Sequence, residues 1–307
     1  MIATQTLSRT TPLAHELHTI AGRLRESVVA IRAGRHGGGS GVIWSRNGLV
    51  ITNSHVAQDE VLAVVLPTGE STAAKLVARD RENDLAALTI NLEPLQPALV
   101  ADSREERVGH LVVAMGHPFG VAQALTAGII SGLPEPDDSR DLLRADILLN
   151  PGNSGGPLAD AEGRVVGINA MVAAPGVALA IPTHVVQAFL ARATGQAGRL
   201  GIEIQPVRLP QRYRERFGLP VPIGLMVTDL LPDGPAYQAG MLLGDVIVQA
   251  AGRLTASPHR LRDEIALTPP GEDVRLTVIR GGERHAFDVG LIRWEAGEVN
   301  PGLTARY

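Results

Sequence analysis

Residues 152–157 read Gly-Asn-Ser-Gly-Gly-Pro, a serine with glycines on both sides. A nucleophilic serine needs a backbone that exposes its hydroxyl and turns amide hydrogens toward the developing oxyanion. Glycines permit such a turn because they carry no Cβ. The pattern favours Ser154 as a nucleophile, with the backbone amides of Gly152 and Ser154 as oxyanion donors, although Gly-Asn-Ser-Gly is also a common loop composition.

Two segments upstream of this serine supply a histidine and an aspartate, the other residue types of a catalytic triad. His55 follows the apolar run at residues 49–51, and Asp84 directly precedes the apolar run at residues 85–88. Taken singly, a histidine at a strand end is usually structural, and an acid there is usually a cap. The order histidine, aspartate, serine is one of the known chain orders of the catalytic triad. Together the residues predict that His55 accepts the Ser154 proton while Asp84 orients and stabilises the imidazole.

The segments around these residues are short apolar runs separated by Gly, Asn, Asp or Pro, which indicates strands rather than helices up to about residue 182. A length of 307 residues favours two domains. We predict five parts, which are an N-terminal segment with a short helix (1–27), a β-rich catalytic domain (28–193), a linker (194–199), a second domain (200–294) and a tail (295–307). The helix that begins at Pro12 is expected to pack on the first half of the catalytic domain.

Composition excludes several classes of protein. The net charge is −4 without a basic stripe, so no nucleic-acid surface is expected. No apolar stretch of about 18 residues is present, so no integral membrane segment is expected. There are no cysteines, which excludes disulfides and thiol catalysis. The first residues lack the apolar core of a signal peptide, so the chain as written is expected in the cytoplasm, or in the periplasm or another extracytoplasmic space if the sequence is trimmed.

Six stretches of the sequence match one set of known motifs: GSGV at 39–42, TNSHV at 52–56, NDLAAL at 83–88, GHPFG at 116–120, DILLNPGNSGGPL at 146–158 and LGDVI at 243–247. Together they resemble the HtrA/Deg family of trypsin-like serine proteases, in which the fourth motif reads GNPFG. The resemblance implies a mainly β chain, with a chymotrypsin-like double β-barrel followed by one PDZ domain. It also implies that His55, Asp84 and Ser154 form an active triad.

The resemblance also implies where peptides bind. A PDZ domain adds a peptide strand to a sheet edge and holds the terminal carboxylate with backbone amides. Leu200, Gly201 and Ile202 match the turn that would do this, and Ile265 would face the last side chain of the ligand unless it is simply core. The expected partners are unfolded or misfolded proteins and peptide C-termini, and relatives of this kind imply a homotrimer.

The resemblance also implies which residues determine the specificity of cleavage. By analogy with chymotrypsin-like folds, Leu148 and Leu149 would form the floor of the primary (S1) pocket, unless these leucines are barrel core. By alignment with the family, Ala170 and Val172 would line the wall of this pocket. An apolar pocket rejects charged side chains, so cleavage after small or medium aliphatic residues is expected. The chemistry needs no metal and no organic cofactor. The alternative function is a PDZ-based peptide binder or chaperone with a latent protease site.

Overall fold

The structure is a computed structural model that describes residues 12–34, 38–59, 62–92, 94–118, 123–135, 138, 140–174 and 176–293. The chain divides into two compact units, one formed by Met1–Leu133 with Leu142–Thr183 and the other by Pro134–Asp141 with His184–Tyr307. The domain boundaries predicted from the sequence stay predictions. The expected tail at 295–307 lies outside the described residues.

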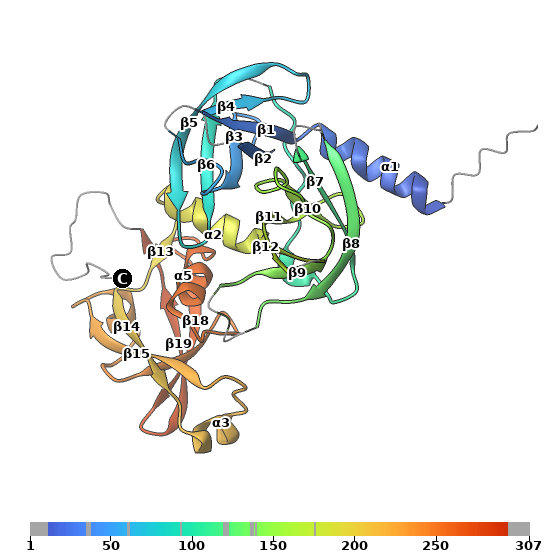
Figure 1. Ribbon diagram of the computed structural model, residues 1–307. Coiled ribbons are helices and arrows are strands. Elements are labelled where there is room, and N and C mark those ends of the chain that lie inside the picture. The colour runs from blue at the N-terminus through green and yellow to red at the C-terminus, as the bar shows by residue number, and fades with distance from the viewer. Residues whose placement is uncertain are drawn as a thin grey trace, which may run out of the picture. The chain divides into compact units, whose positions relative to one another are not determined.

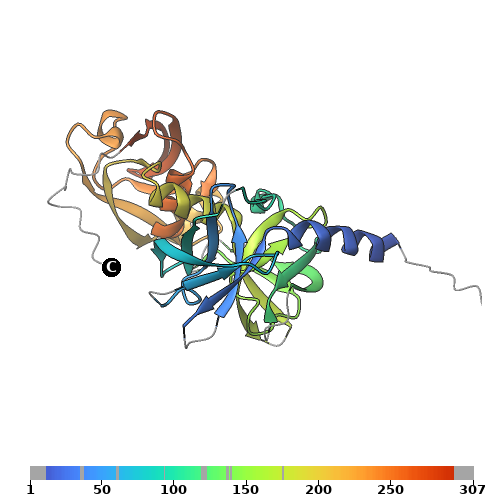
Figure 2. The same ribbon diagram turned by 90° about the horizontal axis from the view of Figure 1, so that it is seen from above.

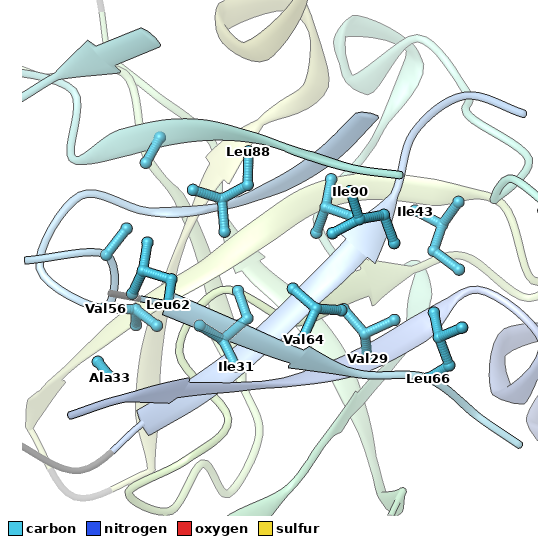
Figure 3. Packing of buried hydrophobic residues seen from close by; sticks show 13 residues of the cluster. Val29, Ile31, Ala33, Ile43, Val56, Leu62, Val64, Leu66, Leu88 and Ile90 are labelled. Carbon is cyan, nitrogen blue, oxygen red and sulfur yellow. The ribbon is translucent and has the colours of Figure 1, made fainter. Parts of the chain in front are cut away.

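The first unit begins with a closed barrel of six antiparallel strands. They are β1 (Val28–Ala33), β2 (Gly38–Ile43), β3 (Leu49–Asn53), β4 (Leu62–Val65), β5 (Ser71–Asp80) and β6 (Leu85–Ile90), joined in the order β1-β2-β3-β6-β5-β4 (Figure 1). Side chains of Val29, Ile31, Val64, Leu88 and Ile90 fill its interior (Figure 3). Branched aliphatic residues suit a small barrel because they pack well on a pleated surface.

A second closed barrel follows and repeats the same topology. Its strands are β7 (Leu111–Gly116), β8 (Ala124–Gly132), β9 (Leu143–Asp146), β10 (Pro157–Ala159), β11 (Val165–Ala174) and β12 (Val177–Pro182), preceded by the short 3₁₀ helix η1 (Ser103–Glu105). Their order around the barrel is β10-β11-β12-β9-β8-β7. Read in reverse, from β7 to β10, it is the first barrel's order with each strand replaced by the one six places later. The prediction of a mainly β chain with a double β-barrel is confirmed.

Helix α1 (Pro12–Arg25) packs on the second barrel, so the prediction that it packs on the first half of the domain is wrong. Its buried residues Ile20 and Leu24 meet Val113 and Met115 of β7. Figures 1 and 2 both show the helix beside β8. Apolar periodicity defines which face of a helix is buried, but it does not identify the surface that covers this face.

The second unit contains a six-stranded sheet, a two-stranded sheet and several helices. Its elements are α2 (Thr183–Ala193), β13 (Gly198–Arg199), β14 (Ile202–Arg208), α3 (Gln211–Phe217), β15 (Ile223–Leu230), α4 (Pro235–Gln238), β16 (Val246–Ala250), β17 (Arg253–Leu254), α5 (Pro258–Ala266), β18 (Asp273–Arg280), β19 (Glu283–Gly290) and β20 (Ile292–Arg293). The main sheet runs β14-β15-β16-β18-β19, which leaves β14 at an edge, and β13 pairs with β20. None of the helices in the described part of the chain has the length and apolarity needed to cross a bilayer.

Apolar packing and ion pairs hold the second unit together. One face of the sheet packs its buried residues Leu225, Ile247 and Val278 against Leu261 of α5. Ion pairs join α5 to more distant parts of the unit, since Arg260 pairs with Asp141 and Asp263 pairs with Arg192. Asp141 also lies 3.7 Å from His184 of α2. The helix that borders the sheet edge is thereby fixed at several points.

Candidate active site

His55 and Asp84 meet because the strands beside them are paired. Strand β3 ends at Asn53 and lies antiparallel to β6, with Asn53 opposite Leu85, so the residues just beyond the two strand ends face each other. The Nδ1 atom of His55 lies 2.8 Å from Oδ2 of Asp84, and the backbone amide of His55 donates to Oδ1 of Asp84 at 3.0 Å. One carboxylate therefore binds both the ring and the main chain of the histidine.

The backbone of Asp84 is held in an uncommon conformation. Its φ is +56°, in the left-handed region that non-glycine residues rarely adopt. Its carbonyl oxygen accepts hydrogen bonds from the amide of Ser54 at 3.1 Å and from Nδ2 of Asn53 at 3.0 Å. Such a conformation persists only where surrounding contacts determine it, and here they present the carboxylate to His55.

The loop that carries Ser154 is hydrogen-bonded to both barrels. The amide of Ser40 in β2 donates to the carbonyl of Ser154 at 2.8 Å, and the amide of Gly155 donates to the carbonyl of Asn169 in β11 at 2.8 Å. Gly155 has a φ of +82°, and a Cβ on it would lie only 2.1 Å from the carbonyl oxygen of Ser40 and 2.2 Å from Oγ1 of Thr52. Only glycine fits this position, and its absence of a side chain lets the serine loop approach the histidine segment.

Gly39 shows directly that the segments of His55 and Ser154 are adjacent. A Cβ placed on Gly39 would lie 2.7 Å from Cγ2 of Val56 and 2.8 Å from the carbonyl oxygen of Ser154. The Ser154 hydroxyl donates to the carbonyl of Ala170 at 3.1 Å rather than to His55. The structure thus brings together the three segments predicted from the sequence and forms the His55–Asp84 pair, while the serine–histidine hydrogen bond is not made in this conformation.

The two expected oxyanion donors are both available. Within the residues that the structure covers, neither the Gly152 amide nor the Ser154 amide has a hydrogen-bond acceptor. Gly152 has a φ of +105°, and a Cβ on it would lie 2.5 Å from the carbonyl oxygen of His117. Glycine is therefore required at position 152, both by the backbone conformation and by the close approach of the loop that carries His117.

The four residues expected in the specificity pocket differ in their exposure. Leu148 is 63% exposed and Val172 is 49% exposed, whereas Ala170 is buried. Leu149 is also buried and belongs to the apolar core of the second barrel. Leu148 and Val172 can therefore meet a ligand directly, while Leu149 supports the barrel from inside.

The residues expected to hold a peptide at the PDZ domain surround the edge strand β14. Gly201 has a φ of +71° just before this strand, and its carbonyl accepts from the amide of Leu231 at 2.9 Å. Leu200 is buried in the PDZ core, while Ile202 and Ile265 are partly buried against the same core. Ile265 therefore contributes to packing, and its partial exposure also leaves part of its side chain open to a ligand.

Two polar residues beside the serine loop were not assigned a role from the sequence. Ser40 is fully buried, and its hydroxyl donates to the carbonyl of Gly152 at 2.7 Å. The backbone amide of His117 donates to the same hydroxyl at 3.0 Å. The signals in the sequence were the serine within Gly39-Ser40-Gly41 and the histidine that replaces asparagine in the GNPFG motif. No cluster of three or more His, Asp or Glu residues arranged for a metal ion occurs in the described segments.

Burial lowers the pKa of His117 below its usual value of 6.5. Below that pH the unfolded chain binds a proton that the folded chain resists, so this residue's contribution to stability is complete above pH 6.5 and is lost as the pH falls. We expect His117→Asn to reduce the fall in Tm of the protease unit between pH 7.5 and pH 5. Calorimetry of this variant beside His18→Asn, which removes an exposed histidine from α1, measures the difference, and equal pH dependence in both would contradict the expectation.

Comparison with known proteins gives two domain matches and relatives that align with most of this chain. The trypsin-like peptidase domain matches residues 39–168, and the PDZ domain matches residues 198–291. A probable periplasmic serine endoprotease of Halomonas elongata, DegP-like, is 36% identical over 281 residues, which are 87% of this chain and 59% of that protein. Its counterpart in Bartonella henselae is 38% identical over 268 residues, 82% of this chain and 52% of that protein. The chain spans between half and three-fifths of the length of these relatives.

Solved structures extend the match to nearly the whole fold. The HtrA-type protease AlgW with a tripeptide is 32% identical with a TM-score of 0.64, covering 91% of this chain and 97% of that one. A serine endoprotease from Yersinia pestis is 28% identical with a TM-score of 0.57, covering 91% and 98%. With the two barrels, the sheet of the second unit and the His55–Asp84 pair, these matches show that the chain belongs to the HtrA-type family of trypsin-like serine endoproteases and carries a PDZ domain, as the resemblance predicted.

Proposed function

We propose that this chain is a serine endopeptidase in which Ser154, His55 and Asp84 act as the catalytic triad. The observation that carries the proposal is the 2.8 Å contact between His55 Nδ1 and Asp84 Oδ2, in a segment that lies beside the Ser154 backbone across Gly39. A carboxylate on Nδ1 holds a proton there and leaves Nε2 as a base. His55 is 44% exposed at its side chain, so its far nitrogen can be reached by a substrate and by water.

The proposed reaction runs in two halves. The Ser154 oxygen attacks the scissile carbonyl while its proton passes to Nε2 of His55, and the resulting oxyanion accepts hydrogen bonds from the amides of Gly152 and Ser154. The imidazolium then gives that proton to the leaving amine, which leaves an acyl-enzyme. Water activated by His55 hydrolyses the ester and restores the serine. The Ser154 hydroxyl has to leave the Ala170 carbonyl and turn toward His55 before the first step.

Digestion of an unfolded protein tests this function. Unfolded casein incubated with the full chain should be cleaved, and a fluorophosphonate should stop cleavage while adding one adduct that peptide mass spectrometry maps to Ser154. A chelator should leave the rate unchanged, because the proposed groups all come from the chain. Cleavage that persists after complete labelling of Ser154 would assign the nucleophile to another residue.

The substrates we propose are unfolded or misfolded proteins, cut after small or medium aliphatic residues. The support is the exposed apolar surface of Leu148 and Val172 near the serine loop, together with Ala170, whose carbonyl holds the Ser154 hydroxyl. An apolar surface offers no partner for the charge of a lysine or arginine side chain, so binding such a residue there would cost desolvation.

Cleavage of a peptide library measures this specificity. We expect kcat/KM for Val, Ala, Leu or Ile before the scissile bond to exceed that for Arg or Lys at least about tenfold. A single methylene in an apolar pocket already changes kcat/KM by about 10- to 200-fold, and burying a charge without a partner costs more. Val172→Asp should reduce the discrimination against basic residues by supplying a counter-charge. Val77→Asp, which places the same charge on an exposed position of β5, is the matched control and should keep the original preference. A native preference for Arg or Lys would contradict the proposed pocket.

The PDZ domain is proposed to bind peptide C-termini by strand addition at β14. This strand lies at the edge of its sheet, next to a turn at Gly201 and with Ile202 and Ile265 partly exposed. The AlgW structures similar to this chain were solved with a tripeptide and a decapeptide. Periplasmic location is proposed from the names of the DegP-like relatives. Assembly as a homotrimer stays a prediction from the family resemblance.

A second function has one observation in its favour. The hydrogen bond from Ser154 to Ala170 leaves the serine unengaged with His55, which is the arrangement expected of a peptide-binding or chaperone protein with a latent protease site. The casein experiment separates the two functions. Binding of casein without cleavage, also in the presence of PDZ-binding peptides, would favour the latent form.

A further inference from the structure

We propose that Ser40 is a positioning residue that sets the orientation of the oxyanion loop through its hydroxyl group. This inference rests on the proposed triad and oxyanion donors. It concerns a residue whose side chain hydrogen-bonds to Gly152 and His117 and not to His55. It assigns to the serine of the Gly39-Ser40-Gly41 segment of β2 a role in catalysis as well as in the strand.

The hydroxyl of Ser40 joins two loops that are distant in the sequence. It donates to the carbonyl of Gly152 at 2.7 Å and accepts from the backbone amide of His117 at 3.0 Å, while Nδ1 of His117 lies 3.4 Å away. Ser40 has no exposed surface, so water cannot replace either bond. Loss of the hydroxyl would therefore leave a buried carbonyl and a buried amide without these bonds.

The bond to Gly152 fixes a peptide plane that lies between the two oxyanion donors. The peptide from Gly152 to Asn153 is held at both ends, because its carbonyl accepts from Ser40 and its amide donates to the carbonyl of Asn150 at 3.0 Å. The amides of Gly152 and Ser154 belong to the peptides on either side of it. Rotation of the central plane would turn at least one of these amides away from the other.

Glycine makes such a constraint necessary. Gly152 has a φ of +105°, and a residue without Cβ passes between backbone conformations at little cost. The backbone of Ser40 is itself fixed, since its amide donates to the carbonyl of Ser154 at 2.8 Å and its carbonyl accepts from Oγ1 of Thr52 at 2.7 Å. Gly152 is thereby bound to strand β2, which also binds the backbone of Ser154.

The Ser40→Ala variant tests the inference. We expect kcat on a valine-containing peptide to fall about 10- to 100-fold with little change in KM, because a displacement of about 1 Å at a reacting group can cost about 10²-fold while substrate contacts remain. The rate of labelling of Ser154 by a valyl phosphonate should fall by a similar factor, since its phosphonyl oxygen occupies the position of the oxyanion. An unchanged kcat and labelling rate would overturn the inference.

Thr183→Val is the matched control for loss of a buried hydroxyl. The Thr183 hydroxyl is equally buried, donates to the carbonyl of Ala101 at 2.7 Å and accepts from the amide of Ser103 at 3.1 Å. We expect this variant to lose Tm as Ser40→Ala does while keeping its kcat. Equal losses of kcat in the two variants would show a merely structural effect and overturn the inference.

If Ser40→Ala does not fold, Ser40→Cys replaces it, because a thiol keeps a side chain at this position but donates a weaker hydrogen bond. A reduced kcat in this variant at native Tm supports the inference, and a native kcat overturns it. Failure of the proposed function would be distinguishable, since the wild-type chain would then neither cleave the peptide nor react at Ser154.

Discussion

Replacing Ser154 by alanine is expected to lower kcat for peptide hydrolysis by about 10⁶-fold, the loss seen when a triad serine is removed from an otherwise intact site. Neither His55 nor the oxyanion donors can form an acyl-enzyme without the serine oxygen. Any residual rate would come from water attack with stabilisation of the oxyanion by the amides of Gly152 and Ser154. The fold should survive, because the hydroxyl's own hydrogen bond is one contact to the carbonyl of Ala170.

Three measurements on Ser154→Ala separate loss of chemistry from loss of structure. Single-turnover kinetics should show no burst of the first product. Tm should remain within a few degrees of the wild-type value, since a single hydrogen bond contributes about 0.5–1.5 kcal/mol. Affinity of the PDZ domain for a C-terminal peptide should be unchanged. A variant that retains more than about one-tenth of the wild-type kcat would remove Ser154 from the proposed mechanism.

The parts of the site that the sequence predicted are those fixed by local patterns. His55 and Asp84 each flank an apolar run, and pairing of the two resulting strands places them opposite each other. The glycines at 152 and 155 predicted an open turn, and their φ values of +105° and +82° confirm that only glycine suits these positions. Local periodicity and turn composition were sufficient to predict these features. Pairing of neighbouring strands in the barrel then brings the residues at the strand ends together.

The features that the sequence did not predict depend on contacts between distant segments. Helix α1 packs on the second barrel although it directly precedes the first, and this choice is made by the complementary surface of β7. Leu148 and Leu149 are adjacent and chemically identical, yet one is exposed and the other lies in a barrel core. Ser40 acquires its role only when β2, residue 117 and residue 152 come together. The residue pattern within one segment does not show which distant segment it will contact.

Replacing Asp84 by asparagine is expected to lower kcat by about 10⁴-fold while preserving the fold. The carboxylate now accepts two hydrogen bonds from His55, one from the backbone amide at Oδ1 and one from Nδ1–H at Oδ2. Asparagine has one amide oxygen and one NH₂ group, so it can accept only one of them. If the oxygen keeps the backbone bond, the NH₂ group faces Nδ1 and drives the proton to Nε2, where it blocks acceptance of the Ser154 proton.

The backbone should tolerate this substitution, since asparagine is also enriched at positive φ and Asp84 has a φ of +56°. Asp80→Asn is the matched control, because Asp80 is a nearby carboxylate that accepts from the amides of Glu82 and Asn83. We expect this control to keep its kcat, and Asp84→Asn to lose kcat and phosphonate labelling together at nearly native Tm. The ring of His55 would then be present but in the wrong tautomer. A kcat for Asp84→Asn within tenfold of wild type would show that the 2.8 Å contact between Asp84 and His55 does not determine the tautomer of the base.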